Sequence, residues 1–382
     1  MGIFNKLVHK LHLSELAYIL ESWKKKKDNK ALYQTVDQAL NYLHGMSPNV
    51  GQACITDRLL PPSDCDLEVI VPCYNVERYV GECVDSILAQ ETKYNFFVTI
   101  INDGSKDRTR EILRKYESFC NVRIIDQENC GHSGARNAGL AQVHGRYVLF
   151  VDSDDILLPG AIDALMSLAV ENNADVVDSG HIRFADSSRT GIMTRIQSCL
   201  YDVLQRPQLF PFNLSSPRIT GYPWGKVLKS ELFHKVQFPK GYWFEDTLVW
   251  MILEPLCNRK VTSDRLTFRY RMNLNSISHK AALNPKSIDT LYVTLQLLKD
   301  RESLGIQFDQ YQYELLLQQM RNNFCRVQFL NTEIKPAVFV VEQDLIANKF
   351  AIWSTTNPKV KPIEDLLRAG DYVDFELWCK WH

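Results

Sequence analysis

The chain has 382 residues, of which 45% are hydrophobic and 23% are charged, a composition typical of a globular protein that buries a core. Its 44 basic and 45 acidic residues leave a formal net charge of −1, so no global field favours a nucleic-acid partner. The 10 cysteines form no C-x-x-C pair, which argues against a zinc site and favours a reducing cytoplasm. We find neither a signal peptide nor an apolar run long enough to cross a bilayer, and therefore expect a soluble or peripheral cytoplasmic protein.

Residues 1–45 are expected to be helical. Apolar side chains recur at helical spacing from Ile3 to Trp23, and a lysine run occupies 24–27. A basic amphipathic helix suits a membrane surface, and it also suits docking on the chain's own domain or on a partner subunit, which we favour. Residues 46–66 are rich in proline and glycine and are expected to form a linker.

From residue 67 onward, short apolar runs alternate with amphipathic helices. Expected strands cover 67–71, 96–101, 122–125, 147–151 and 175–179, and expected helices cover 79–90, 109–119, 133–143 and 161–172. This alternation predicts an α/β fold with a mostly parallel sheet flanked by helices. After about residue 285 the strand pattern gives way to helices, for example 288–304 and 311–329. We therefore expect an N-terminal helical extension and linker (1–66), a sheet domain (67–282) and a C-terminal helical region (283–382).

Polar motifs follow the first two expected strands at the edge where ligands bind in such sheets. The first strand is followed by Pro72-Cys73-Tyr74-Asn75-Val76-Glu77, and the second by Asn102-Asp103-Gly104-Ser105-Lys106-Asp107. The Asp103 carboxylate is suited to accept from a nucleobase or a ribose hydroxyl. The Tyr74 ring is suited to stack on a base.

An acidic turn, Asp152-Ser153-Asp154-Asp155, follows the fourth expected strand. Three carboxylates within four residues are costly to desolvate without a cation. Oxygen ligands suit Mg²⁺ or Mn²⁺, which bridge carboxylates to substrate phosphates. One of the three, for which we favour Asp155, can instead cap the next helix.

A glycine-rich stretch, Asn129-Cys130-Gly131-His132-Ser133-Gly134-Ala135-Arg136-Asn137-Ala138-Gly139, opens the helix before that turn. Arg136 can reach a phosphate or brace the acidic turn. By itself this stretch is weak evidence, because glycine-rich helix starts are common.

Taken in order, P-C-Y-N-V-E-x-Y, I-N-D-G-S-x-D, N-x-G-x-S-x-A-R-N-x-G and F-V-D-S-D-D resemble the inverting glycosyltransferase family 2, which has the A-type (GT-A) fold. The resemblance is dense over about 67–180 and continues more thinly to about 280, through 224–226, 244–246 and 270–271. Residues 1–66 and those after about 285 have no counterpart that we can place in the family.

The resemblance implies a role for each matching residue. It implies nucleotide-sugar contacts from Pro72, Tyr74, Asn75, Glu77, Asp103, Asn129, Arg136, Asp152 and Ser153. It implies that Asp154 ligates Mn²⁺ or Mg²⁺ on the diphosphate. Asp246 would be the general base that deprotonates the acceptor hydroxyl, with Glu245 orienting the acceptor.

Three further residues carry weaker expectations. Trp224 is a candidate platform for the acceptor sugar, and His279 a candidate second metal or phosphate ligand. Arg271 is a candidate diphosphate contact. Each of them fits an ordinary packing or surface position as well.

These expectations combine into a metal-dependent inverting enzyme that moves a single hexose from a UDP-sugar to a hydroxyl of a glycan or lipid-linked glycan. The chain lacks the Gln-x-x-Arg-Trp sequence of processive synthases, which favours single-sugar transfer. Surface polysaccharide or glycoconjugate synthesis at the inner face of the cell membrane fits the family habit and the basic N-terminus. A second copy of the chain is a further candidate partner.

Two other functions remain open. A sugar-phosphate nucleotidyltransferase also uses such a sheet and Mg²⁺, but it would be expected to carry a basic glycine-rich loop after the first strand. A non-catalytic subunit that binds a nucleotide sugar is the second alternative. The complete set of expected carboxylates argues against it.

Overall fold

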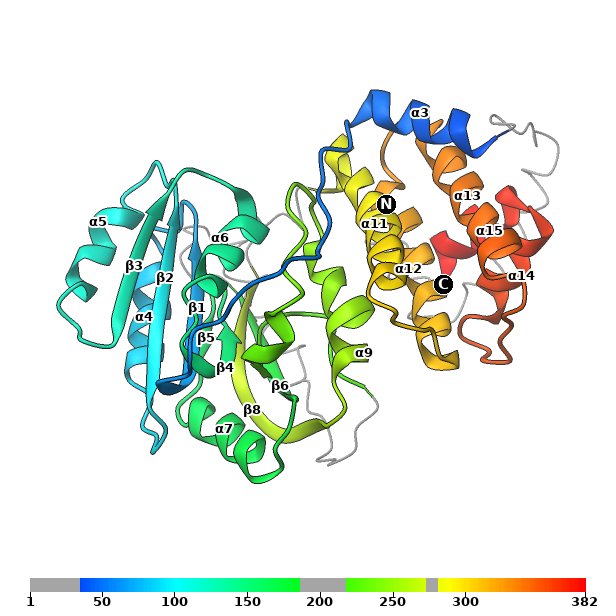
Figure 1. Cartoon of the computed structure of the whole chain (residues 1–382). Coiled ribbons are helices and arrows are strands. Elements are labelled where there is room, and N and C mark those ends of the chain that lie inside the picture. The colour runs from blue at the N-terminus through cyan, green and yellow to red at the C-terminus, as the bar shows by residue number, and fades with distance from the viewer. Residues whose placement is uncertain (1–34, 186–217, 273–280) are drawn as a thin grey trace. The chain divides into compact units, whose positions relative to one another are not determined.

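The computed structural model describes residues 35–185, 218–272 and 281–382 (Figure 1). These residues form two compact units. The sheet unit contains 51–185, 218–272 and 296–306, and the helical unit contains 35–50, 281–295 and 307–382. The ends of the described chain, which the sequence analysis treated separately, thus share one unit. The expected N-terminal amphipathic helix and His279 lie outside the described residues.

The sheet unit is built on a mixed sheet of eight strands in the order β3-β2-β1-β4-β7-β6-β8-β5. The strands are β1 (Cys65–Cys73), β2 (Phe96–Asp103), β3 (Val122–Gln127), β4 (Gly145–Phe150), β5 (Ile156–Leu157), β6 (Val176–Ala185), β7 (Lys226–Lys229) and β8 (Lys260–Met272). The pairs β1–β2, β2–β3, β1–β4 and β6–β8 are parallel, and the three remaining pairs are antiparallel. The expected α/β fold with a mostly parallel sheet is confirmed.

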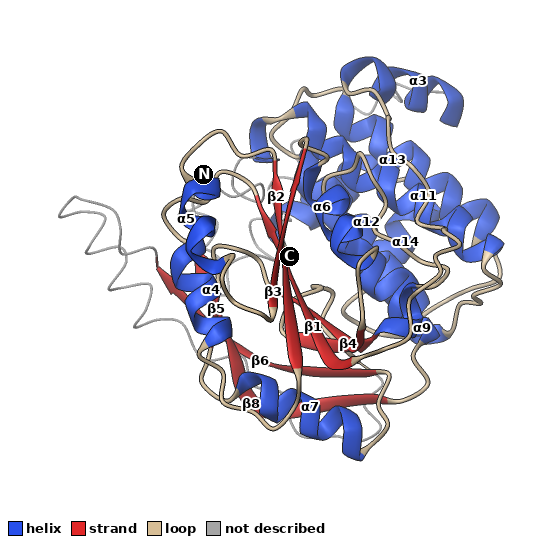
Figure 2. Ribbon diagram, turned by 60° about the vertical axis from the view of Figure 1, so that its left-hand side comes forward, coloured by secondary structure: helices blue, strands red, loops and turns tan. Residues whose placement is uncertain are grey.

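Helices cover both faces of this sheet (Figures 1 and 2). They are α4 (Val80–Leu88), α5 (Thr109–Leu113), α6 (Gly131–Leu140) and α7 (Ala161–Glu171), and a short α9 (Glu254–Leu256) follows a π-helical turn at Val249–Leu253. Helices α4, α5 and α7 share one apolar cluster with Val69 and Val71 of β1. Helix α6 packs on the other face, where a Cβ at Gly139 would lie 2.6 Å from Ile70 Cγ2. Gly139 therefore permits the close approach of α6 to the sheet.

The structure refines several expected boundaries. The expected helix 109–119 is a short α5 that tightens into a 3-10 turn at Arg114–Tyr116. The expected strand 175–179 extends to Ala185, because its second half pairs with β8. Strands β5, β7 and β8 were not predicted as strands. They complete the sheet through antiparallel or long-range pairing that no local apolar run indicates.

The helical unit consists of α3 (Val36–Met46), α11 (Asp289–Ser303, whose last turns belong to the sheet unit), α12 (Gln310–Val327), α13 (Ile334–Asp344), α14 (Lys361–Ala369) and α15 (Tyr372–Trp381). Thr35 caps α3 by accepting from Gln38 N–H. In the part of the chain that the structure describes, no helix is long and apolar enough to span a membrane.

Candidate active site

The ends of β1 and β4 lie side by side where the strand order reverses. From β1 the chain proceeds to β2 and β3 on one side, whereas β4 pairs with β1 on the other side. Ligands of open α/β sheets bind outside the carboxyl ends of the strands at such a point. The motifs that begin at Tyr74 and Asp152 directly follow these two strands.

The turn after β1 is fastened to the turn after β2 by side-chain to backbone hydrogen bonds. Lys106 N–H donates to Asn75 Oδ1 at 2.7 Å, and Arg108 N–H donates to Glu77 Oε2 at 3.0 Å. Asn75 adopts a left-handed backbone with φ 52°. Asn75 and Glu77 therefore shape the edge, while Tyr74 is 46% exposed and presents ring surface there.

Asp103 ties the end of β2 to the start of α6. Its carboxylate is 2% exposed, and Oδ1 accepts from Gln127 Nε2 at 2.6 Å and from the Cys130 N–H at 2.8 Å. Gly104, at φ 69°, makes the following turn, where an added Cβ would lie 2.8 Å from Asn129 N. The exposed Asn129 is thereby held next to the β2 turn.

Arg136 joins the acidic turn to the Glu245-Asp246 pair. Its Nη2 donates to Asp152 Oδ1 at 2.9 Å, and its Nη1 donates to Glu245 Oε1 at 2.6 Å. Its guanidinium is 3% exposed and lies 5.2 Å from the Phe238 ring centroid. The planar fork of arginine can satisfy two carboxylates at once. Of the two expectations, contact with a phosphate or bracing of the acidic turn, the structure shows the bracing.

His132 is a site residue that the sequence analysis did not assign. Its Nδ1 lies 3.5 Å from Glu245 Oε1. Desolvation of the imidazole is the largest influence and, with the Arg136 charge, favours the neutral form. The hydrogen bond and charge of Glu245 and the charge of Asp152 together outweigh them and raise the pKa of His132. Burial alone would raise the pKa of Glu245, yet the His132 hydrogen bond and the Arg136 charge lower it. The i, i+4 spacing of His132 and Arg136, which places both on one helix face, is the sequence feature that could have identified it.

The Glu245-Asp246 pair sits on a strained turn. A 3-10 turn covers Glu245–Thr247, and Phe244 before it has φ 65°. A left-handed backbone at a bulky residue costs about 1–3 kcal/mol of folding free energy, and residues in this conformation are concentrated at functional sites. Glu245 is buried, whereas Asp246 is half-buried.

Asp155 and Arg271 brace the acidic turn from within. Asp155 is fully buried, and its Oδ1 accepts from the Arg271 N–H at 2.7 Å. Burial, together with the charges of Asp154 and Asp152, raises its pKa well above the usual range. Arg271 Nε donates to the Asp154 carbonyl at 2.7 Å, and its Nη2 donates to Glu82 at 2.5 Å. Asp155 thus anchors β8 rather than capping the next helix, and Arg271 holds the turn where we had expected a diphosphate contact.

Trp224 does not fit the expected role of a sugar platform. Its side chain is 7% exposed and stacks with Tyr222, Phe268 and Tyr270 at centroid distances of 4.4, 4.8 and 5.1 Å. His181 meets it edge-on at 5.0 Å. Because other aromatic rings cover the indole, Trp224 is a packing residue.

Pro72 and Ser153 are buried, as are Asp103 and Arg136 among the expected nucleotide-sugar residues. Pro72 lies within β1, and Ser153 is 5% exposed in the acidic turn. The second expected metal ligand, His279, lies outside the described residues.

The acidic turn offers oxygen ligands that fit a divalent cation. Asp152 and Asp154 are half-buried, whereas Asp155 is fully buried and committed to Arg271. Across residues 35–185, 218–272 and 281–382, no cluster of three or more His, Cys, Asp or Glu could hold a metal ion by itself. Mg²⁺ and Mn²⁺ suit this arrangement, since such ions take one or two carboxylates and complete their shell with substrate phosphates and water.

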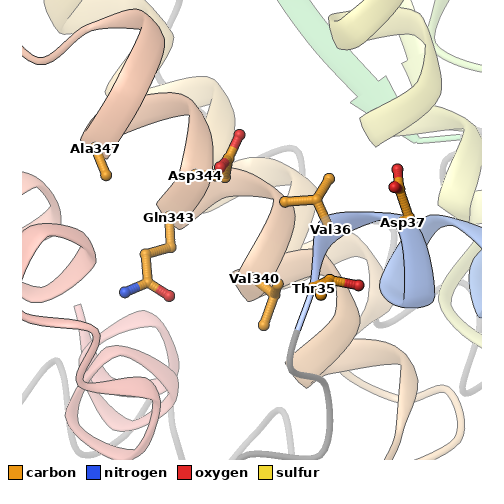
Figure 3. A pocket seen from close by; sticks show the side chains of 7 residues that line it. All are labelled: Thr35, Val36, Asp37, Val340, Gln343, Asp344 and Ala347. Atoms are coloured by element: carbon orange, nitrogen blue, oxygen red, sulfur yellow. The ribbon is translucent and has the colours of Figure 1, made fainter.

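A hollow of about 510 Å³ lies elsewhere, in the helical unit (Figure 3). It is lined by Thr35, Val36, Asp37, Val340, Gln343, Asp344 and Ala347. Its charged side chains are two carboxylates, Asp37 and Asp344, and among the described residues no basic side chain lines it to receive a diphosphate. The candidate active site is therefore at the sheet edge.

Comparison with known proteins supports this fold. The family model described as Glycosyl transferase family 2 matches residues 68–225. Glycosyltransferase GlyG of Streptococcus pneumoniae serotype 4 is 31% identical over 219 residues, which cover 55% of this chain and 72% of GlyG. Glycosyltransferase GlyA of the same organism is 31% identical over 221 residues, which cover 56% of this chain and 32% of GlyA. The chain thus spans about a third of the length of GlyA.

A third relative is the poly(ribitol-phosphate) beta-N-acetylglucosaminyltransferase TarS of Staphylococcus aureus, 38% identical over 112 residues, or 28% of this chain and 20% of TarS. The crystal structure of TarS 1-349 in complex with UDP-GlcNAc superimposes with a TM-score of 0.51 at 18% identity, covering 81% of this chain and 89% of that chain. This likeness shows the fold. Together with the GlyG match and the motifs at the sheet edge, it establishes that the chain belongs to glycosyltransferase family 2 and that its sheet unit is a GT-A-type glycosyltransferase domain.

Proposed function

We propose that this chain transfers a single hexose from a UDP-sugar to a hydroxyl of a glycan acceptor, with inversion at the anomeric carbon. The observation that carries the proposal is the Arg136 bridge, which holds Asp152 and Glu245 together at the switch point of the sheet. A donor-side carboxylate and the Glu-Asp pair are then within one hydrogen-bonded network. Family membership makes a nucleotidyltransferase the weaker alternative.

The proposed donor site follows the ends of β1, β2 and β4. Tyr74 would stack on the uracil. Asp103 would accept a hydrogen bond from the base or the ribose, in addition to the structural hydrogen bonds that its Oδ1 already accepts. Asn75 and Glu77 would act by shaping this edge, and Asn129 lies next to it. Asp152 would contact the ribose or the donor sugar. Pro72 and Ser153, which are buried, would contribute through the backbone.

Asp154 would hold Mn²⁺ or Mg²⁺ at the donor diphosphate. Such an ion, when bound, neutralises the charge that develops on the departing diphosphate. The chain's own contribution is to aim the acidic turn. Arg271 fixes its backbone at the Asp154 carbonyl, and Arg136 fixes the Asp152 carboxylate.

Asp246 would remove the proton from the attacking hydroxyl. A sugar hydroxyl is a poor nucleophile, so a carboxylate within hydrogen-bond reach is needed during attack. Glu245, held ionised by Arg136 and by its contact with His132, would orient the acceptor or the base. One base and one displacement at the anomeric carbon give inversion.

The acceptor and cellular setting are proposed from relatives. TarS is by name a beta-N-acetylglucosaminyltransferase that acts on poly(ribitol-phosphate). We infer a glycan or lipid-linked glycan acceptor in surface polysaccharide or glycoconjugate biosynthesis, at the cytoplasmic face of the membrane. Contact of the N-terminal segment with that membrane, and pairing of two copies of the chain, remain parts of this proposal.

Asp246→Asn tests the proposed base. We expect turnover, measured as UDP release with acceptor present, to fall by about 10²- to 10⁴-fold, because the amide cannot take the proton. UDP binding, measured by calorimetry with Mn²⁺, should be unchanged. Asp64→Asn, at the amino end of β1 away from the site, is the matched control and should keep full turnover. Wild-type turnover in Asp246→Asn would refute the assignment.

A further inference from the structure

The loop 235–246, which ends in the Glu245-Asp246 pair, needs support from its surroundings. Phe244 holds a left-handed backbone immediately before the pair. Such a conformation persists only where neighbouring structure fixes it. The contacts of this loop are therefore informative about how the pair is positioned.

Helix α6 provides the first set of contacts. Asn137 forms a two-way amide clasp on Phe238: its Nδ2 donates to the Phe238 carbonyl at 2.8 Å, and its Oδ1 accepts from the Phe238 N–H at 2.9 Å. Ser133 Oγ donates to the Pro239 carbonyl at 2.7 Å. With the Arg136–Glu245 bond, one face of α6 thus holds both ends of the loop.

The segment 51–58 provides the second set. It runs antiparallel to the loop, with an isolated bridge between Ile55 and Val236. Four backbone hydrogen bonds join the two segments. The N–H groups of Gln52, Thr56 and Arg58 donate to the carbonyls of Lys240 (2.9 Å), Lys235 (3.0 Å) and His234 (2.8 Å), and the Gln237 N–H donates to the Cys54 carbonyl (2.7 Å). The sequence analysis took this segment for a linker, and it precedes the region 68–225 that matches the family.

Gly51 and Tyr242 meet at the end of this ladder. A Cβ on Gly51 would lie 1.8 Å from Tyr242 Cζ, so the ring occupies the space that a side chain would need. Tyr242 is 6% exposed and stands two residues before Phe244. Displacement of its ring would act on the backbone that carries Glu245 and Asp246.

We propose that segment 51–58 is a positioning element of the acceptor side, which together with α6 fixes loop 235–246 and so places the Glu245-Asp246 pair. Gly51 and Tyr242 are the positioning residues through which it acts. This inference rests on the proposed function, in which Asp246 is the base. It assigns a role in transfer to a part of the chain that lies outside the family match.

Gly51→Ala tests the proposal in the full-length chain. We expect kcat to fall about tenfold, since small misplacement of a catalytic group is costly, while UDP affinity stays at the wild-type value. The matched control is Gly45→Ala in α3, where an added Cβ meets nothing within 4 Å and kcat should not change. A purely structural role would lower the melting temperature of Gly51→Ala and leave kcat intact at temperatures where the variant is folded.

A double variant distinguishes the steric effect of the added Cβ on the Tyr242 ring from a general loss of stability. Tyr242→Leu removes the ring atoms nearest to the added Cβ, so Gly51→Ala should cost much less kcat in that background than in the wild type. An equal loss in both backgrounds, or a parallel loss of UDP affinity, would overturn the proposal.

If Gly51→Ala does not fold, Thr56→Pro is the alternative test of the segment. Proline lacks the N–H that Thr56 donates to the Lys235 carbonyl in the ladder. A folded Thr56→Pro chain with wild-type kcat would also overturn the proposal. If Asp246→Asn is inactive while both segment variants turn over normally, only this inference fails. If Asp246→Asn stays active, it is the proposed base that fails.

Discussion

The proposed donor and acceptor sides are built from different kinds of contact. The donor edge is formed by turns that directly follow neighbouring strands, and hydrogen bonds such as Lys106 N–H to Asn75 connect one strand-end motif to the next. Loop 235–246 is instead held by residues about a hundred positions earlier, as in the Asn137–Phe238 clasp. The donor edge thus follows from strand order, whereas the acceptor side depends on segments that meet only when the unit is folded.

Arg136 is the point where the two sides meet. It belongs to α6, whose other polar side chains hold the loop, yet one of its nitrogens donates to Asp152 of the acidic turn. Substitutions on the donor side should therefore lower the affinity for UDP, and substitutions on the acceptor side should lower kcat. A change at Arg136 should appear in both.

Replacement of Arg136 should have the largest effect. Arg136→Met leaves the Asp152 and Glu245 carboxylates without their shared partner, and removal of one member of a buried ion pair costs about 3–5 kcal/mol of stability. We expect a lower melting temperature, weaker UDP binding and a loss of turnover of at least about 100-fold.

Arg136→Lys is the graded variant, because a lysine cannot serve both carboxylates with the geometry of the fork. It should fold better than Arg136→Met but still lose turnover. Arg146→Met, an exposed position on β4, is the control. An Arg136→Lys enzyme with wild-type kcat and UDP affinity would show that the two sides are not joined here.

Tyr74→Ala should affect the donor side alone. Loss of base stacking on an exposed aromatic ring is worth about 1–3 kcal/mol, so UDP affinity should fall about tenfold while the acceptor KM stays unchanged. Tyr74→Phe keeps the ring and should bind UDP like the wild type. Titration calorimetry with UDP measures the difference, and equal affinities for the Ala and Phe variants would remove Tyr74 from the donor site.

The same contrast explains what the sequence could predict. Parallel strands place their ends at one edge, so the motifs at Tyr74, Asp103 and Asp152 could be brought together from strand order alone. Local apolar runs also predicted the central strands of the sheet, because a strand such as β1 is buried along nearly its whole length. The ladder between 51–58 and the loop could not be predicted, since this short segment of the expected linker carries no apolar pattern that indicates its partner.

The roles of single residues were difficult to predict from the sequence for a related reason. Trp224 carries the same side chain whether it faces a sugar or three other rings, and only the placement of Tyr222, Phe268 and Tyr270 decides between the two. Arg271 was a candidate either for a diphosphate contact or for an ordinary strand position. It holds the acidic turn from β8, through its hydrogen bonds to Asp155 and to the Asp154 carbonyl. Residues whose role depends on antiparallel strands of the second half of the sheet were thus the least predictable.

His132→Gln should have the smallest effect and should give the acceptor side a pH dependence. Desolvation of the imidazole and the Arg136 charge oppose the imidazolium. Glu245, 3.5 Å away, and the Asp152 charge together outweigh them and raise the pKa of His132. A raised pKa means that the His132–Glu245 ion pair is fully formed below the ordinary pKa of histidine and is lost as the pH rises through the raised value.

Wild-type kcat should therefore decline on the alkaline side of that value, while His132→Gln, which keeps a polar side chain without a charge, should stay flat across the same range. Because His132 is 45% exposed, the ion pair should be worth no more than about 1 kcal/mol, a change of a few-fold in kcat at low pH. Measuring both enzymes at each pH cancels the titration of the diphosphate. If the alkaline decline persists in His132→Gln, the group that titrates lies elsewhere, and Glu245 is organised by Arg136 alone.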